Sequence, residues 1–235
     1  KDPGSWTTDS VDIWQEGLQF PCVKLFSRGQ PIQSVFDIIE ANVRTPDMTL
    51  GDVWAQVASC RLGALRFQEL CRRHGTATVR EAIQVLFDYG EAMVLREMAK
   101  LPPGVYEAED WIDDDGLTPD SIYCKVKVTV SDSEFVCDFT GTSPQTAGPV
   151  NCSWTGLNSA VRMVFKALTD PHIPANEGCF RPMKIVCPDG TVFTAKRPAP
   201  VSTYWDSMIF AADLVWKAMA PAVPHRLAAG HFMSV

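Results

Sequence analysis

Residues 133–154 hold a dense set of polar side chains that could take part in chemistry. Apolar residues alternate from Phe135 to Phe139, which predicts a buried strand with Asp138 at its end. A loop rich in Gly, Ser and Thr follows and leads to Asn151. Such a strand places a carboxylate and backbone N–H groups beside a cleft, where they could position charge at a reacting group. The same composition is also typical of a hairpin end whose Asp and Thr side chains satisfy their own turn.

Further polar candidates precede this loop. Asp52 and Gln56 lie four residues apart on one face of an expected helix, with Arg44 just upstream. A polar pair near a helix start with an Arg close by could hold a carboxylate or a phosphate. Asp52 could equally be an ordinary acidic residue in the first turn of the helix. Among the first thirty residues Glu16 is the polar candidate, and a surface salt bridge is its alternative role.

Two features that could indicate metal binding or disulfides do not fit those roles. The three aspartates from Asp113 to Asp115 lack the alternating spacing of a calcium loop and the Glu at its twelfth position. The eight cysteines form no CxxC pair, and most lie in apolar periodic segments. A chain of 235 residues is also too long to need disulfides for stability. We therefore predict no metal site within this chain, and free thiols in a cytoplasmic protein.

The elements that must position these residues indicate an α+β fold. Amphipathic helices are expected in an N-terminal region, residues 1–104, at 31–45, 49–74 and 79–100. In the second region, residues 105–235, the patterns predict strands near 105–110, 121–130 and 135–139, a hairpin around 188–190, and helices at 157–168 and 204–220. We expect the N-terminal helices to pack with a mostly antiparallel sheet and the further helices.

Composition and missing motifs exclude several classes of function. A net charge of −7, a pI of about 5.1 and the lack of any Lys/Arg run argue against a nucleic-acid partner. No apolar run approaches the ~20 residues needed to cross a bilayer, so no membrane association is predicted. No GxGxxG, P-loop or GxSxG motif occurs. The chain opens without methionine and ends in an apolar segment, so we expect an internal portion of a longer subunit.

The polar loop resembles a segment of a known family. Asp138-Phe-Thr-Gly-Thr-Ser-Pro-Gln followed by Gly148-Pro-Val-Asn151 resembles the DFxGSSPQ…GPxN segment of the hydantoinase B/oxoprolinase family. Four further blocks resemble that family in the same order: Asp2-Pro-Gly-Ser with Ile13-Trp-Gln-Glu16-Gly, Asn42-Val-Arg44-Thr-Pro-Asp with Leu50-Gly-Asp52-Val-Trp-Ala-Gln56, Asp113-Asp-Asp-Gly116, and Ile173-Pro-Ala-Asn176-Glu-Gly-Cys-Phe-Arg181-Pro. Together the blocks cover roughly residues 2 to 195.

The resemblance implies a B-type subunit that works on a small-molecule substrate with an A-type partner subunit, which binds ATP. Such enzymes activate a carbonyl by phosphorylation and then either open a cyclic amide or carboxylate an enol phosphate. The family's divalent-metal motif lies just before the position of Asp2, outside this chain. Matching the blocks predicts three catalytic residues, Asp138, Asn151 and Glu16. It also predicts a set of substrate-binding residues: Arg44, Asp52, Gln56, Asn176 and Arg181.

One departure from the family pattern bears on the reaction. Where hydrolase-type members have a GNxExS-like segment, this chain has Val201-Ser-Thr-Tyr-Trp-Asp-Ser-Met. Tyr204 and Trp205 would make a substrate pocket more aromatic and less suited to hydrogen-bonding an amide ring. We therefore expect carboxylation of a ketone, as in acetophenone and acetone carboxylases. Hydrolysis of a hydantoin or 5-oxoproline is the alternative, and a scaffold that docks the A-type partner is a non-enzymatic one.

Overall fold

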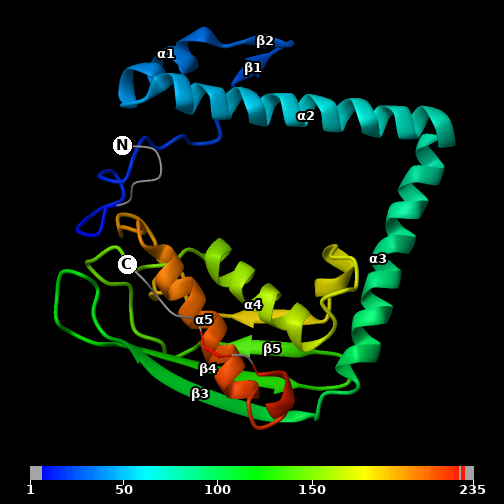
Figure 1. Cartoon of the computed structure of the whole chain (residues 1–235), viewed down its shortest axis with the longest axis vertical. Helices are drawn as coiled ribbons and strands as arrows, with labels where there is room; N and C mark the ends of the chain where they lie inside the picture. The colour runs from blue at the N-terminus through cyan, green and yellow to red at the C-terminus, as the bar shows by residue number, and fades with distance from the viewer. Residues whose placement is uncertain (1–6, 228, 231–235) are drawn as a thin grey trace. The chain divides into compact units, whose positions relative to one another are not determined.

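The computed structural model describes residues 7–227, 229 and 230 (Figure 1). These residues form two compact units. Unit 1 comprises residues 16–83, and unit 2 comprises residues 7–15 together with 84–230. The division falls within one helix, between Ile83 and Gln84, whereas the domain boundary at residues 104/105 stays a prediction from the sequence. The first resembling block, at residues 2–5, lies outside the described residues.

Unit 1 is helical, with a two-stranded ribbon at its start. Its elements are β1 (Phe26–Ser27), β2 (Gln30–Pro31), α1 (Gln33–Asn42), α2 (Pro46–His74) and the first part of α3 (Thr76–Met98). Phe36 stacks on Trp54 with 5.2 Å between the ring centroids, which fixes α1 against α2. No residue of α2 is buried, so this helix leaves apolar side chains such as Phe67 uncovered in the described structure.

The start of α2 differs from the sequence prediction. The sequence predicts one helix at residues 31–45 and a second that begins at residue 49. In the structure α2 begins at Pro46. A proline is tolerated at the first helical position because the backbone N–H of that position has no hydrogen-bond partner within the helix, so nothing is lost when proline lacks it. The first turn therefore carries Asp47, and Asp52 lies farther along the helix. The helix ends before Gly75, as predicted.

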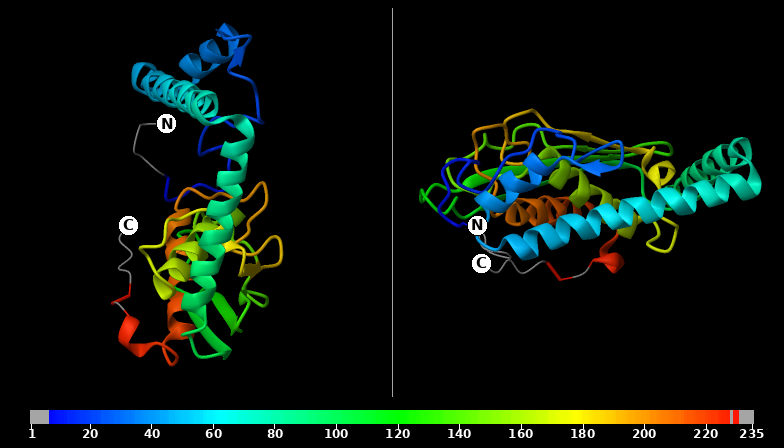
Figure 2. Two further views of the ribbon diagram at one scale, coloured as in Figure 1. Left: turned by 90° about the vertical axis from the view of Figure 1, so that its right-hand side faces the viewer. Right: turned by 90° about the horizontal axis from the view of Figure 1, so that it is seen from above.

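Unit 2 is built on a four-stranded sheet in the order β3-β4-β5-β6. After the remainder of α3 its elements are β3 (Gly104–Ile112), β4 (Ile122–Val130), β5 (Phe135–Asp138), α4 (Trp154–Leu168), the 3-10 turn η1 (Glu177–Phe180), β6 (Met183–Val186), α5 (Tyr204–Met219) and η2 (Pro224–Arg226). The first three strands pair antiparallel, and β6 joins β5 in parallel. The helices α4 and α5 lie side by side on one face of this sheet (Figures 1 and 2). The α+β prediction is confirmed.

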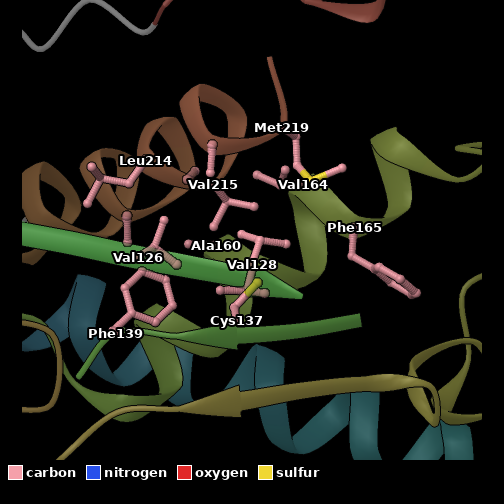
Figure 3. Close-up of a cluster of buried hydrophobic side chains, with 14 of the residues drawn as sticks. Val126, Val128, Cys137, Phe139, Ala160, Val164, Phe165, Leu214, Val215 and Met219 are labelled. Carbon is pink, nitrogen blue, oxygen red and sulfur yellow. The ribbon is translucent and has the colours of Figure 1, made fainter. Parts of the chain in front are cut away.

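The core of unit 2 lies between the sheet and these two helices. Alternate residues of β4, from Ile122 to Val130, are buried as the alternating pattern predicts. Figure 3 shows two of them, Val126 and Val128, beside apolar residues of both helices, for example Val164 of α4 and Val215 of α5. Burial of these stripes fixes the positions of the helices, and so the position of the loop that leads into each.

The expected hairpin around residues 188–190 is wrong. Thr191 forms only an isolated bridge to Pro144, and the chain then turns. The hydroxyl groups of Thr191 and Thr194 lie 2.8 Å apart, and Thr194 is bonded to the backbone of this turn. Local side-chain bonds therefore replace the strand pairing that the alternating residues indicated. Among the described residues, no helix is long and apolar enough to cross a membrane.

Candidate functional site

The loop from Thr146 to Asn151 is organised by the Asn151 side chain, which is fully buried. Its Oδ1 accepts a hydrogen bond from the Thr146 N–H at 2.8 Å. Its Nδ2 donates to the carbonyl oxygens of Thr146, Gly148 and Pro200 at 3.0, 2.9 and 3.0 Å. Backbone groups thus occupy both polar atoms of the amide. This geometry favours a positioning role for Asn151, and direct catalysis stays a prediction.

A buried carboxylate joins this loop to the turn that follows β3. Oδ1 of Asp115 accepts hydrogen bonds from the N–H groups of Leu117 and Thr118 at 2.9 and 2.7 Å, and Oδ2 accepts one from the Gly148 N–H at 2.9 Å. Burial by itself would raise the pKa of Asp115, but the hydrogen bonds from Thr118, Leu117 and Gly148 outweigh it and hold the pKa below its ordinary value. The turn and the loop therefore form one rigid wall.

The start of α5 is attached to the same wall. The Thr203 N–H donates to the Pro149 carbonyl oxygen at 3.1 Å. One turn later, the buried Ser207 hydroxyl donates to the Val150 carbonyl oxygen. Three segments that are far apart in the sequence are thereby brought to one place: the 113–116 turn, the 146–151 loop and the N-terminus of α5.

These segments, with Thr8, surround a cleft of about 350 Å³. Its apolar walls are supplied by five residues: Trp111, Ile112, Pro149, Val150 and Phe210. Its polar groups include four carboxylates: Asp113, Asp114, Asp115 and Asp206. No Lys, Arg or His is among the described residues that line it. The cleft has the size of a small-molecule site, and its carboxylates give it a negative potential.

Asp206 is the carboxylate in this cleft whose bonding is incomplete. The residue is 6% exposed, and its Oδ1 is buried without a hydrogen-bond partner among the described residues. The Oγ1 atom of Thr203 beside it is buried without a partner as well. Burial raises the pKa of Asp206, and the Thr203 hydroxyl opposes this in part without completing a hydrogen bond. An open acceptor in a cleft wall is a group that a bound donor can satisfy.

Asp206 and Asp115 should affect the pH dependence of the free energy of unfolding in opposite directions, because the pKa of Asp206 is raised and that of Asp115 is lowered. A raised pKa means that the folded protein holds this proton more tightly than the unfolded chain. Its contribution is therefore full below the ordinary carboxyl pKa of about 3.9 and is lost as the pH rises through the higher folded value. We expect Asp206→Asn to be more stable than the wild type at pH 7, with the difference shrinking towards pH 3.5. Urea denaturation at several pH values measures this, and an unchanged difference would contradict it.

Asp138 lies at the end of β5, and it is not among the residues that line the cleft. Its Oδ1 accepts a hydrogen bond from the Thr140 N–H at 2.9 Å, and its Oδ2 is 3.5 Å from Nζ of Lys127, its partner across the sheet. Burial would raise the pKa of Asp138, but the hydrogen bonds from Thr140 and the charge of Lys127 lower it overall. The carboxylate thus satisfies its own turn and a cross-strand pair, and its catalytic role stays a prediction.

Asn176 and Arg181 flank η1, and in unit 2 they contact α3. Nδ2 of Asn176 donates to the Leu86 carbonyl oxygen at 3.3 Å. Nη1 of Arg181 is 2.8 Å from Oδ1 of Asp88 and 2.6 Å from Oε2 of Glu91. Neither residue lines the cleft. Through these contacts the two residues hold the η1 segment against α3. That they bind substrate stays a prediction.

Within unit 2, Tyr204 and Trp205 do not line the cleft either. Tyr204 is exposed at the first position of α5, and its ring lies edge-on to that of Trp205. Four candidates belong to unit 1: Glu16, Arg44, Asp52 and Gln56. Glu16 is half-buried in its loop, while the other three are exposed. Within unit 1, Asp52 and Gln56 share one face of α2, as the spacing predicts.

Sequence reasoning missed Asp206, Thr203 and Asp115 as site residues. Asp115 could have been found, since the Asp113-Asp-Asp-Gly116 block is one of those that resemble the family. Asp206 lies in the first turn of α5, where acidic residues are common because they oppose the helix dipole. Its burial beside residues of the 113–116 turn and the 146–151 loop, which line the same cleft, depends on tertiary structure that no local pattern reveals.

The profile of the hydantoinase B/oxoprolinase family matches residues 1–235 of this chain. The chain is 37% identical, over 240 residues, to the B-type component of the putative D-/L-hydantoinase of Pseudomonas sp. (strain NS671), and the match covers 97% of this chain and 40% of that protein. It is 29% identical to the beta component of the caprolactamase of Pseudomonas jessenii over 235 residues, covering 97% of this chain and 40% of that protein. The chain thus spans about 40% of the length of these relatives.

Two solved structures share the fold. The ATP-dependent caprolactamase of Pseudomonas jessenii superposes with a TM-score of 0.83 at 27% identity, covering 96% of this chain and 39% of that one. Acetone carboxylase in its nucleotide-free form superposes with a TM-score of 0.85 at 18% identity, covering 95% and 31%. The second likeness concerns the fold alone.

Proposed function

Because the chain belongs to the hydantoinase B/oxoprolinase family, we propose that it is part of a B-type subunit of an ATP-dependent enzyme that opens a cyclic amide. The observation that carries this proposal is the difference in identity among its relatives. The hydantoinase component is 37% identical and the caprolactamase 27–29%, whereas acetone carboxylase is only 18% identical. Ring opening is therefore favoured over the ketone carboxylation that the segment 201–208 led us to expect.

The positions of two aromatic residues also support ring opening over carboxylation. Tyr204 and Trp205 were expected to make the pocket aromatic. Neither lines the cleft, and the residues of this segment that do line it are Thr203 and Asp206, of which Asp206 carries a hydrogen-bond acceptor without a partner among the described residues. An acceptor of this kind suits an amide ring better than a ketone, which has no N–H to donate.

The proposed reaction joins ATP cleavage to the opening of an amide bond. Transfer of a phosphoryl group to the amide carbonyl oxygen makes the carbon more electrophilic and turns that oxygen into part of a good leaving group. Water then adds to the carbon and the C–N bond breaks, so that the ring nitrogen leaves as an amine and an acyl phosphate remains. A second water attacks the carbonyl carbon of the acyl phosphate, and inorganic phosphate leaves with the former amide oxygen. In this scheme the chain supplies a rigid wall that binds and orients the ring, because orientation removes much of the entropic barrier.

We place ATP on an A-type partner subunit, and the divalent metal on a segment that lies outside this chain. Among the described residues, no group of three or more His, Cys, Asp or Glu is arranged to hold a metal ion. The names of the two relatives designate each as one component of a multi-subunit enzyme, which supports the existence of a partner for this chain.

The test uses the complete B-type polypeptide copurified with its A-type partner. With ATP and either hydantoin or caprolactam, we expect release of ADP in step with the ring-opened acid, and no ring opening when a non-hydrolysable ATP analogue replaces ATP. A parallel reaction contains acetophenone or acetone with labelled bicarbonate. Acid-stable label in a keto acid, with no ring opening of any lactam, would establish carboxylation instead.

A scaffold role is the second candidate, and one observation favours it. The polar groups of Asn151 and Asp115 are occupied by backbone groups, which supports a role for these residues in shaping the subunit. In that case the cleft would bind nothing, and substitution of Asp206 would leave turnover by the complex unchanged.

A further inference from the structure

We propose that the cleft at the start of α5 binds the N–H edge of a neutral or cationic planar ligand through Asp206, and that it excludes anions. For the proposed function, on which this inference rests, the ligand is an uncharged cyclic amide or ureide. A ring that carries its own carboxylate, such as 5-oxoproline, would be a poor substrate. The inference thus names the class of substrate and the residue that selects it.

The first support is the unsatisfied state of the buried polar groups. Oδ1 of Asp206 and Oγ1 of Thr203 are buried in the cleft wall, and neither has a hydrogen-bond partner among the described residues. An orphaned acceptor is unfavourable unless a donor reaches it. A ligand N–H can donate to Asp206 while the Thr203 hydroxyl, which can donate or accept, takes a neighbouring polar atom of the same ring.

The second support is the charge of the cleft. Four aspartates line it, and no Lys, Arg or His is among its described lining residues. Asp115 is already satisfied by N–H groups of its own turn and of Gly148, so it adds negative potential without offering a free acceptor to a ligand. A second carboxylate brought into this space would meet like charges with no counter-ion. A neutral ring avoids that repulsion, and the binding of a cation is favoured by the negative potential of the aspartates.

The third support is the shape of the walls. Trp111 and Phe210 supply aromatic faces, and Ile112, Pro149 and Val150 supply aliphatic ones. A volume of about 350 Å³ lies at the small end of ligand sites, which suits a single ring rather than a nucleotide. The rigid connections among the three segments keep the acceptor in place before a ligand arrives, which lowers the entropic loss on binding.

The experiment is calorimetric titration of the complete protein without ATP, so that binding is measured apart from turnover. Four probes are compared at pH 7: hydantoin and caprolactam as neutral rings, guanidinium as a planar cation and 5-oxoproline as an anion. We expect both neutral rings and guanidinium to bind, and 5-oxoproline to bind at least ~10-fold more weakly. Asp206→Asn should weaken the binding of guanidinium at least ~10-fold. It should also reduce the difference in affinity between caprolactam and 5-oxoproline.

The matched control is Asp189→Asn, which removes the same charge from a side chain that is 78% exposed and does not line the cleft. It should bind all four probes as the wild type does. Thermal melting shows that both variants are folded. Binding of 5-oxoproline as tightly as caprolactam, no binding of any probe, or unchanged guanidinium binding by Asp206→Asn would overturn the inference.

The two proposals fail in different ways. If the complex binds lactams through Asp206 but does not open them with ATP, the proposed function fails and the binding site stands. If the complex opens lactams and Asp206→Asn does so with unchanged KM, the function stands and the assignment of the cleft fails.

Discussion

Replacing Asn151 by alanine is expected to lower the free energy of unfolding by about 3–5 kcal/mol. The substitution leaves the Thr146 N–H and the carbonyl oxygens of Thr146, Gly148 and Pro200 without their partner. Each buried polar group left unsatisfied costs about 1–3 kcal/mol, and a cavity adds to this. Because small domains are stable by only ~5–15 kcal/mol, this loss would be a large fraction of the total stability.

Urea denaturation followed by circular dichroism measures this loss. Asn158→Ala is the matched control, since Asn158 lies half-buried on α4 and should change stability little. The kinetic readout separates structure from catalysis. If Asn151→Ala unfolds like the wild type but loses more than ~10²-fold in turnover, Asn151 acts on the substrate as the family resemblance implied, and the positioning role is wrong.

Replacing Gly148 by alanine is expected to destabilise unit 2 by about 3 kcal/mol or more. A Cβ atom at this position would lie 1.9 Å from the Asp115 carbonyl oxygen and 2.8 Å from its carboxyl carbon. The neighbour is backbone, which cannot move aside without breaking the hydrogen bond from the Gly148 N–H to Oδ2 of Asp115. The clash therefore separates the 113–116 turn from the 146–151 loop and opens the cleft wall.

Thermal and urea denaturation measure this effect. Gly63→Ala is the control, because no atom lies within 4 Å of a Cβ built at this helical position. Alanine is the better helix former by about 1 kcal/mol, so Gly63→Ala should be neutral or stabilising. A Gly148→Ala protein as stable as the wild type would show that the turn and the loop do not touch as described.

Much of the fold could be predicted from local patterns. The alternation from Ile122 to Val130 identifies β4 and its buried face, and the periodicity of α3, α4 and α5 identifies the helices that cover the sheet or extend from it. The start of α2 was misplaced because Pro46 was taken as the end of one helix rather than the start of the next. Proline is compatible with both, and tertiary context decides between them.

The candidate site could be predicted only in part, because its geometry is long-range. The resembling blocks include the 113–116 turn and the 148–151 loop, which the structure joins by a hydrogen bond. They gave no indication that Asn151 bonds to Pro200, or that Asp206 is buried beside Thr203. Polar residue types alone cannot separate a side chain that holds a loop from one that meets a ligand, since both are polar and lie close to a cleft.

The most direct test of ring opening follows the carbonyl oxygen of the substrate. Caprolactam labelled with ¹⁸O at its carbonyl is incubated with the complete B-type polypeptide, its ATP-binding partner and ATP, and the inorganic phosphate is analysed by mass spectrometry. If the carbonyl is phosphorylated before water opens the ring, one ¹⁸O atom per turnover appears in phosphate. If all of the ¹⁸O remains in the ring-opened acid, phosphorylation of the carbonyl is contradicted. If no lactam is opened while labelled bicarbonate is fixed into a keto acid, the account of this protein as part of a ring-opening enzyme is contradicted.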